Sequence, residues 1–158
     1  MKKAWFILLC MTFLSMTLLS ASALAQGPEG LIIVESQNDV DTTLSKLEAM
    51  IDEVEGLNVM SVIDHQANAE GVGLELRPTR VVLFGNPNAG TPLMQAAQSV
   101  AIDLPQKMLI WEDENGTVFL GYNDPEYLKT RHGIEGADEG LTKISGLLDK
   151  LASGAAQP

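Results

Sequence analysis

The chain is poor in reactive side chains, because its 158 residues include a single cysteine and two histidines. Cys10 lies inside an apolar N-terminal stretch, so a mature protein without that stretch has no disulfide, no thiolate nucleophile and no cysteine-ligated metal. His65 and His132 are the only imidazoles, and no helical spacing or other ligand signature groups them. A G-x-S-x-G nucleophile elbow is also absent. We therefore predict no cofactor and no bound metal.

Basic residues are few as well, and the chain is strongly acidic. It has 10 Lys and Arg against 21 Asp and Glu. Two of the basic residues, Lys2 and Lys3, belong to the N-terminal stretch, so its removal leaves 8 − 21 = −13 with histidine neutral. Such a surface repels phosphate backbones and anionic lipid headgroups, which argues against binding to nucleic acid or to membrane surfaces. Solubility explains the acidity, while a basic partner remains allowed.

Residues 1–25 have the layout of a secretory signal peptide. A basic start precedes an apolar core that runs to about Leu19, and Ala23-Leu24-Ala25 supplies small residues before a cleavage point. Polar residues interrupt the apolar core before it reaches the roughly 20 residues that a membrane span needs. We predict cleavage after Ala25, a periplasmic or secreted location in a bacterium, and no membrane attachment afterwards.

The remaining chain is long enough for one domain with a modest core. We expect a short leader over 26–30, a single domain over 31–152 and a disordered tail over 153–158. Hydrophobic periodicity predicts strands over 31–34, 57–64 and 79–84, and helices over 40–54, 92–100, 125–132 and 137–151. In the strand over 57–64, alternation places Leu57, Val59, Ser61 and Ile63 on one face and Met60, Val62 and Asp64 on the other.

Residues 107–122 carry the clearest hairpin signal. Asn115-Gly116 favours a two-residue type I′ turn, whose central residues have positive φ. This register places Trp111 opposite Leu120 and Leu109 opposite Tyr122, and we assign that aromatic side of the hairpin to the core.

The stretch LFGNPNAGTP, residues 83–92, raises the question of a phosphate-binding loop. Gly85 and Gly90 have the Walker A separation, but Thr91-Pro92 stands where the pattern requires lysine, which argues against nucleotide binding. Helix-start chemistry explains the same residues, with Thr91 as N-cap and Pro92 as the first helical residue. The loop could still offer amide donors to a small anion or polar ligand.

Ordered motifs over residues 81–134 resemble the family known as domain of unknown function 302. They are FGNP at 84–87, AGTPLMQ at 89–95, DLP at 103–105, YNDP at 122–125 and RH at 131–132; Asp64-His65 and LRPTR at 76–80 are similar to earlier blocks. The resemblance implies an α+β fold, a two-layer sandwich with helices packed on one face of a mostly antiparallel β-sheet. It implies no settled activity.

Most residues of these motifs fall in predicted loops, where binding residues concentrate. The candidate ligand-binding residues are Asn86, Thr91, Asp103, Tyr122, Asn123, His65 and His132. We hypothesise that the loop after Phe84, the DLP turn and the YND turn meet around a shallow polar pocket with a histidine on its rim. Alternatively, Asn86 and Asp103 only fix turns through side-chain hydrogen bonds.

These observations favour an exported, non-enzymatic domain that binds a small polar ligand or a protein partner through the 84–92 loop. Two alternatives stay open: a small enzyme with histidine and aspartate as acid and base, and a metal-binding envelope protein using both histidines and methionine. The metal alternative requires the two histidines to lie close together. The enzyme alternative requires one of them to border a pocket with Asp64, Asp103 or Asp124. A homodimer is compatible with each.

Overall fold

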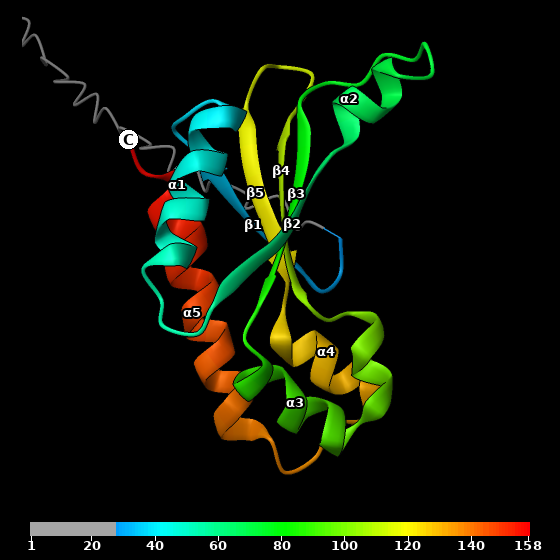
Figure 1. Ribbon diagram of the computed structural model, residues 1–158, viewed down its shortest axis with the longest axis vertical. Coiled ribbons are helices and arrows are strands. Elements are labelled where there is room, and N and C mark those ends of the chain that lie inside the picture. The colour runs from blue at the N-terminus through cyan, green and yellow to red at the C-terminus, as the bar shows by residue number, and fades with distance from the viewer. Residues whose placement is uncertain (1–27) are drawn as a thin grey trace, which may run out of the picture.

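The computed structural model describes residues 28–158, which form a five-stranded antiparallel sheet and its helices (Figure 1). The predicted signal peptide lies outside the described residues. The elements are β1 Leu31–Ser36, α1 Val40–Asp52, β2 Asn58–Asp64, α2 His65–Glu70, β3 Thr79–Gly85, α3 Pro87–Ala96, the 3₁₀ helix η1 Gln98–Ile102, β4 Gln106–Glu112, β5 Val118–Asn123, α4 Pro125–His132 and α5 Asp138–Ala156. The strand order is β1-β5-β4-β3-β2.

Helices α1 and α5 cover one face of the sheet, with α3 and α4 at one end and α2 projecting at the other (Figure 1). The core lies between these two layers. Its fully buried side chains come from α1, α5 and the inner strands, and include Leu47, Ile51, Val82, Met108, Ile110, Leu120, Leu148 and Leu151. The predicted two-layer α+β architecture, with helices on one face of the sheet, is confirmed.

The opposite face of the sheet is also apolar, and we call it the open face. Side chains alternate along a strand, so Met108 and Ile110 of β4 are buried beneath the helices while Leu109 and Trp111 point the other way and are half-buried. Cross-strand pairing defines the apolar residues of the open face as Leu31, Ile33, Ile63, Val81, Leu83, Leu109, Trp111 and Phe119. Strand β1 lies at one edge of the sheet, and its odd-numbered residues point to the open face.

Helix α3 begins five residues before the predicted helix start. Asn86 is its N-cap, with the side-chain Oδ1 accepting from the Asn88 N–H at 2.9 Å, and Pro87 takes the first helical position. Thr91 and Pro92 lie inside the helix, so the prediction of Thr91 as N-cap is wrong. Asn-Pro offers the same helix-start chemistry as Thr-Pro, and it comes first along the chain. Pro92 then removes only one backbone hydrogen bond from a short helix.

The predicted hairpin register is wrong by one residue. Trp111 pairs with Phe119 and Leu109 with Gly121. The Asp113 carboxylate accepts from the N–H groups of Asn115 and Thr117 at 2.8 and 2.9 Å, and of the loop residues only Gly116 has a positive φ, 78°. These features produce a three-residue loop with a glycine bulge, not a two-residue type I′ turn.

This register divides the hairpin aromatics between the two faces of the sheet. Tyr122 is buried in the core, as expected, with 2% of its surface exposed. Trp111 instead lies on the open face, where its ring stacks on Phe119 with 5.4 Å between centroids. The assignment of Trp111 and Leu109 to the core is therefore wrong, because a shift of one residue reverses the face of a side chain.

Strand β2 contains a bulge that breaks the expected alternation. Val59 pairs with Phe84 and Ser61 with the next residue of β3, Leu83, so Met60 is the additional residue. Met60 is 55% exposed. Val59 therefore points to the helix side of the sheet. Beyond the bulge, Ser61 and Ile63 point to the open face and Val62 points to the helix side.

The predicted disordered tail over 153–158 is wrong for residues 153–156, which continue α5. Ala155 and Ala156 are buried, and the Gln37 N–H donates to the Ala156 carbonyl at 2.9 Å. Gly154 packs so closely on Met50 that a Cβ there would overlap its side chain. A run of small residues suggests flexibility in the sequence, but here small size permits close helix packing.

Candidate functional site

A cavity of about 370 Å³, which we call the α3 cavity, lies where α3, α5 and the ends of β2, β3 and β4 meet. Eighteen residues line it, and none of them is charged. They are Val54, Leu57, Met60, Phe84, Gly85, Asn86, Pro87, Ala89, Gly90, Thr91, Met94, Ala101, Leu104, Pro105, Gln106, Ile144, Leu147 and Leu148. Because only Asn86, Thr91 and Gln106 carry polar side chains, the wall is mainly apolar.

Small residues of the FGNPNAG stretch leave this space open. A Cβ added to Gly90 would lie 3.6 Å from Leu104 Cδ1, and one added to Gly85 would lie 3.4 Å from Met60 Cε. Both distances are ordinary contacts with residues that also line the cavity. Larger side chains at either glycine would extend into the cavity and reduce its volume.

The backbone donors of the loop are already engaged. Asn86 accepts the N–H of Asn88 with its side chain and those of Ala89 and Gly90 with its carbonyl, each at about 3 Å. Pro87 has no N–H to offer. The loop therefore does not present the free amide donors that we expected for a small anion. Asn86 forms the side-chain to backbone hydrogen bond that the turn interpretation required, whereas the Asp103 carboxylate contacts His132 and Arg131.

Three polar side-chain groups at the cavity have no partner within residues 28–158. They are the Asn86 Nδ2, the Thr91 hydroxyl and the Gln106 amide. In this part of the chain, every side-chain nitrogen or oxygen that is sealed from solvent has a hydrogen-bond partner. These groups therefore face the cavity or solvent and are free to bind a ligand.

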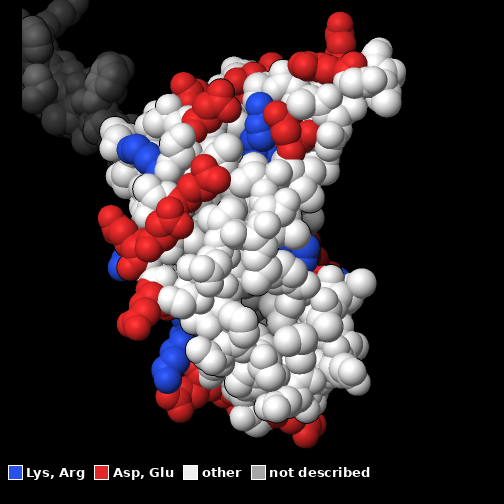
Figure 2. All heavy atoms as spheres, in the orientation of Figure 1, with Lys and Arg blue, Asp and Glu red and all other residues white. Residues whose placement is uncertain are grey.

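The face that contains α3 carries little charge. Figure 2 shows acidic side chains over α1 and along the outer side of α5, with another group at the α2 end, whereas the surface between α5 and α3 is uncharged and hollowed. On the face that Figure 2 shows, the acidic side chains therefore lie away from the hollow.

The structure separates the seven candidate site residues. Asn86 and Thr91 line the α3 cavity; Asp103, Tyr122, Asn123, His65 and His132 do not. Asn123 pairs with Leu31 in the sheet. Tyr122 lies in the core, where burial first, and then the carboxylates of Asp149 and Asp124, raise the pKa of its hydroxyl above the usual 10.0. The three turns do not meet around one polar pocket with a histidine rim.

Asp103 and His132 do lie together, in a network that joins η1 to α4. His132 Nε2 is 2.6 Å from Asp103 Oδ2, and the Ser99 hydroxyl is 3.0 Å from His132 Nδ1. Arg131 Nη1 lies 3.4 Å from the same carboxylate. His132 and Asp103 are mostly buried, with side chains 6% and 13% exposed. Neither residue lines the α3 cavity or three other cavities of comparable size within residues 28–158. The network joins η1 to α4.

His65 lies far from this network. It begins α2 at the projecting end of the molecule, whereas His132 ends α4 at the opposite end (Figure 1). In the part of the chain that the structure describes, no group of three or more His, Cys, Asp or Glu side chains is arranged to hold a metal ion. The metal-binding alternative therefore loses its histidine pair.

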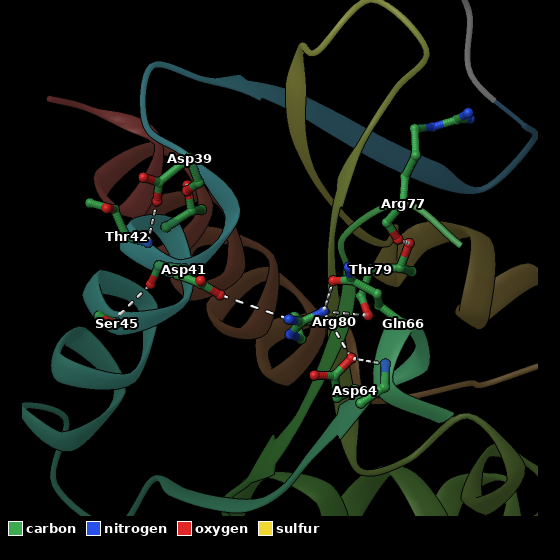
Figure 3. A network of polar contacts seen from close by, with 11 residues as sticks. Asp39, Asp41, Thr42, Ser45, Asp64, Gln66, Arg77, Thr79 and Arg80 are labelled. Atoms are coloured by element: carbon green, nitrogen blue, oxygen red, sulfur yellow. Dashed lines mark hydrogen bonds and ion pairs between the residues drawn. The ribbon is translucent and has the colours of Figure 1, made fainter. Parts of the chain in front are cut away.

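Arg80 is the centre of a second network. The sequence analysis included this residue only as part of the LRPTR motif. Figure 3 shows its guanidinium between α1 and the β2–α2 junction. Nη1 lies 2.9 Å from Asp64 Oδ1, Nη2 lies 3.9 Å from Asp41 Oδ1, and Nη1 donates to Gln66 at 3.4 Å. Asp64 also caps α2 through the Ala67 N–H. Arg80 therefore links β3 to the β2–α2 junction, and its contact with the exposed Asp41 of α1 is weak. In the sheet, Arg80 lies opposite Asp64 of β2.

A family model described as "Domain of unknown function DUF302" matches residues 32–151, so the chain belongs to this family. The crystal structure of an uncharacterized conserved DUF302 protein from Bacillus stearothermophilus superposes with a TM-score of 0.72 at 19% identity, covering 81% of this chain and 99% of that one. The two proteins share the fold.

Curated relatives carry a different kind of name. The fluoride-specific ion channel FluC 1 of Brucella suis biovar 1 (strain 1330) is 39% identical over 129 residues, which are 79% of this chain and 50% of the relative. FluC 1 of Brucella abortus biovar 1 (strain 9-941) has the same identity, with 47% of its length covered. This chain spans about half the length of these relatives. Within residues 28–158, none of the helices has the length and apolar character needed to cross a membrane.

Proposed function

We propose that this member of the DUF302 family binds a small, neutral and largely apolar molecule in the α3 cavity. The observation that carries the proposal is an apolar wall with a few unpaired polar groups, which is the usual character of a ligand pocket. The proposed site keeps the 84–92 loop that the sequence indicated. The apolar wall changes the expected ligand from a polar molecule to a mainly apolar one with a polar end.

The size and charge of the cavity support this class of ligand. Its volume of about 370 Å³ falls in the range of roughly 300–1,000 Å³ that ligand pockets occupy. An ionised ligand would lose its hydration there and find no opposite charge among the lining residues.

Thr91 and Gln106 are suited to hold the polar end of the ligand. The Thr91 hydroxyl can donate and accept, and the Gln106 amide offers both kinds of group. Gln106 lies opposite Phe84 in the sheet, so its side chain points to the helix side beside the apolar wall. A ligand hydroxyl or carbonyl fits these partners.

A series of linear 1-alkanols tests the proposal. Each methylene that enters the cavity contributes about 0.8 kcal/mol, so affinity should rise about fourfold per carbon and stop rising once the cavity is full. Thermal-shift titration of the purified protein measures this series. Absence of a shift at every chain length, or a rise without any limit, would contradict binding in a cavity of fixed size.

A second candidate function follows from the Brucella relatives. They are named as fluoride-specific ion channels, and about half of their length is similar to this chain. Fluoride itself is a poor ligand for an uncharged cavity in an acidic protein. The chain would instead act as a protein partner of a fluoride channel.

Vesicles containing the half of the Brucella suis relative that this chain does not match would test this partnership. Adding the purified protein should change the rate of fluoride efflux, and the heat-denatured protein should not. An unchanged rate, together with no co-purification of the two proteins, would refute the second candidate.

We also propose that the chain is exported and that residues 1–25 are removed. The support is the basic, apolar and small-residue layout of this segment. Mass spectrometry of the protein recovered from bacterial cells should give a chain that begins at Gln26. Substitution Ala25→Asp should block cleavage, and recovery of the uncut wild-type chain would argue against the signal.

A further inference from the structure

We propose that two copies of this chain associate through the open face of the sheet, with residues 71–78 of each copy reaching over the sheet of the other. We call residues 71–78 the arm. The proposal does not depend on the α3 cavity or on its ligand, because it concerns a different surface.

The arm exposes apolar side chains that its own molecule does not cover. Val72, Leu74 and Leu76 are 73%, 65% and 45% exposed. Figure 1 shows the α2 region and the arm projecting beyond the sheet on the side opposite α1 and α5, which is the side of the open face. Large apolar residues gathered on a projecting segment mark an interaction surface.

The arm is held in position and is continuous with the open face. At its base, Arg77 Nε donates to the Glu112 carbonyl at 3.2 Å, and the Glu112 N–H donates to the Pro78 carbonyl at 3.0 Å. Glu112 directly follows Trp111, whose ring packs over Gly121 on the open face. The arm and the Trp111–Phe119 pair therefore form one surface.

The charges of this surface favour a second copy as its partner. Cross-strand pairing gives the open face one acid, Glu35, and one base, Lys107. The arm likewise has Glu75 and Arg77. Both parts are therefore neutral on a chain of net charge −11. Two acidic copies can meet here without the like-charge repulsion that other surfaces would produce.

The open face alone has too little area for a stable dimer interface, and the arm adds to it. Five strands about 4.8 Å apart, with about six residues each rising 3.3 Å, give a footprint of roughly 500 Å². A standard interface buries about 800 Å² per partner, so the sheet alone is too small and the arm supplies the remainder. A two-fold axis brings the same surface of both copies together, as closed dimers require.

Analytical ultracentrifugation of protein purified from cells expressing the whole chain tests the proposal. Between roughly 1 and 100 μM, where an interface of standard size associates, we expect a dimer. Ile33→Glu on the open face and Leu74→Glu on the arm should each raise the dissociation constant by about 100-fold or more, because each buries an unpaired charge at the interface.

Val62→Glu is the matched control. Ile33 and Val62 lie on the two edge strands and are similarly exposed, at 36% and 37%. Val62, however, points to the helix side of the sheet. The control variant should leave the dimer intact. Leu74 is so exposed that its substitution cannot unfold the domain, so this variant remains informative if Ile33→Glu is unstable. A monomeric wild type, a dimer that both test variants keep, or dissociation by Val62→Glu to the same extent would overturn the proposal.

Discussion

Filling the α3 cavity from its own wall should stabilise the protein and abolish ligand binding at once. Gly90 lies inside α3, and a Cβ there meets only Leu104 Cδ1 at 3.6 Å. Replacing a helical glycine gains about 0.5–1 kcal/mol. Three further carbons of leucine placed in the cavity add about 2 kcal/mol at about 0.8 kcal/mol each. We therefore expect Gly90→Leu to raise the free energy of unfolding by about 3 kcal/mol.

Urea unfolding and calorimetry measure this gain, which corresponds to about 10 °C in Tm at roughly 3–4 °C per kcal/mol for a domain of this size. The alkanol series should lose its response in the same variant. Gly146→Leu is the control, because Gly146 lies inside α5 with no atom within 4 Å of an added Cβ. It should gain only the helix contribution, about 0.5–1 kcal/mol. A Gly90→Leu variant less stable than wild type would show that the space beside Gly90 is filled in solution.

Three further predictions test the networks and the core. His132→Ala should lower the free energy of unfolding by about 1–3 kcal/mol, because it leaves the mostly buried Asp103 carboxylate without its closest partner; Ser99→Ala, at an exposed residue, should cost less than about 1 kcal/mol in the same urea titration. Arg80→Met should cost about 0.2–1 kcal/mol by removing the ion pair to Asp64, whose side chain is 38% exposed and keeps its hydrogen bond from the Ala67 N–H, and circular dichroism melting would show no loss if Arg80 were dispensable. The pKa of Tyr122 is raised in the folded protein, so its hydroxyl ionises at lower pH in the unfolded chain than in the folded one. The free energy of unfolding should therefore keep its full Tyr122 contribution below pH 10 and fall as the pH rises further. Tyr122→Phe should reduce this fall.

Helices α1 and α4 were predicted well because their signals are local. The apolar spacing from Val40 to Ile51 identifies α1, and Asp124-Pro125 identifies the start of α4, where the Asp124 side chain accepts from the Glu126 N–H. A cap or a periodic face depends on residues within one or two turns. Such features can therefore be deduced from sequence alone.

The strands were located correctly, but their registers were not. One bulge in β2 and one additional loop residue after Asp113 reverse the direction of the side chains beyond them. Each reversal is decided by a few hydrogen bonds, and pairings without the bulge or the additional loop residue would form similar numbers of them. The placement of Trp111 on the open face follows from such a choice, so the apolar second surface could not be predicted from alternation.

The motif FGNPNAG illustrates why the candidate site was located but its chemistry was not. Sequence reasoning treats a conspicuous loop as a set of groups that touch a ligand, and it selected Asn86 for that reason. In the folded chain Asn86 uses its side-chain oxygen and its carbonyl to start α3. The glycines and Ala89 instead leave room beside Leu104 and Met60. The motif therefore contributes empty volume more than contacts, and that volume exists only once α3, η1 and α5 have packed around it.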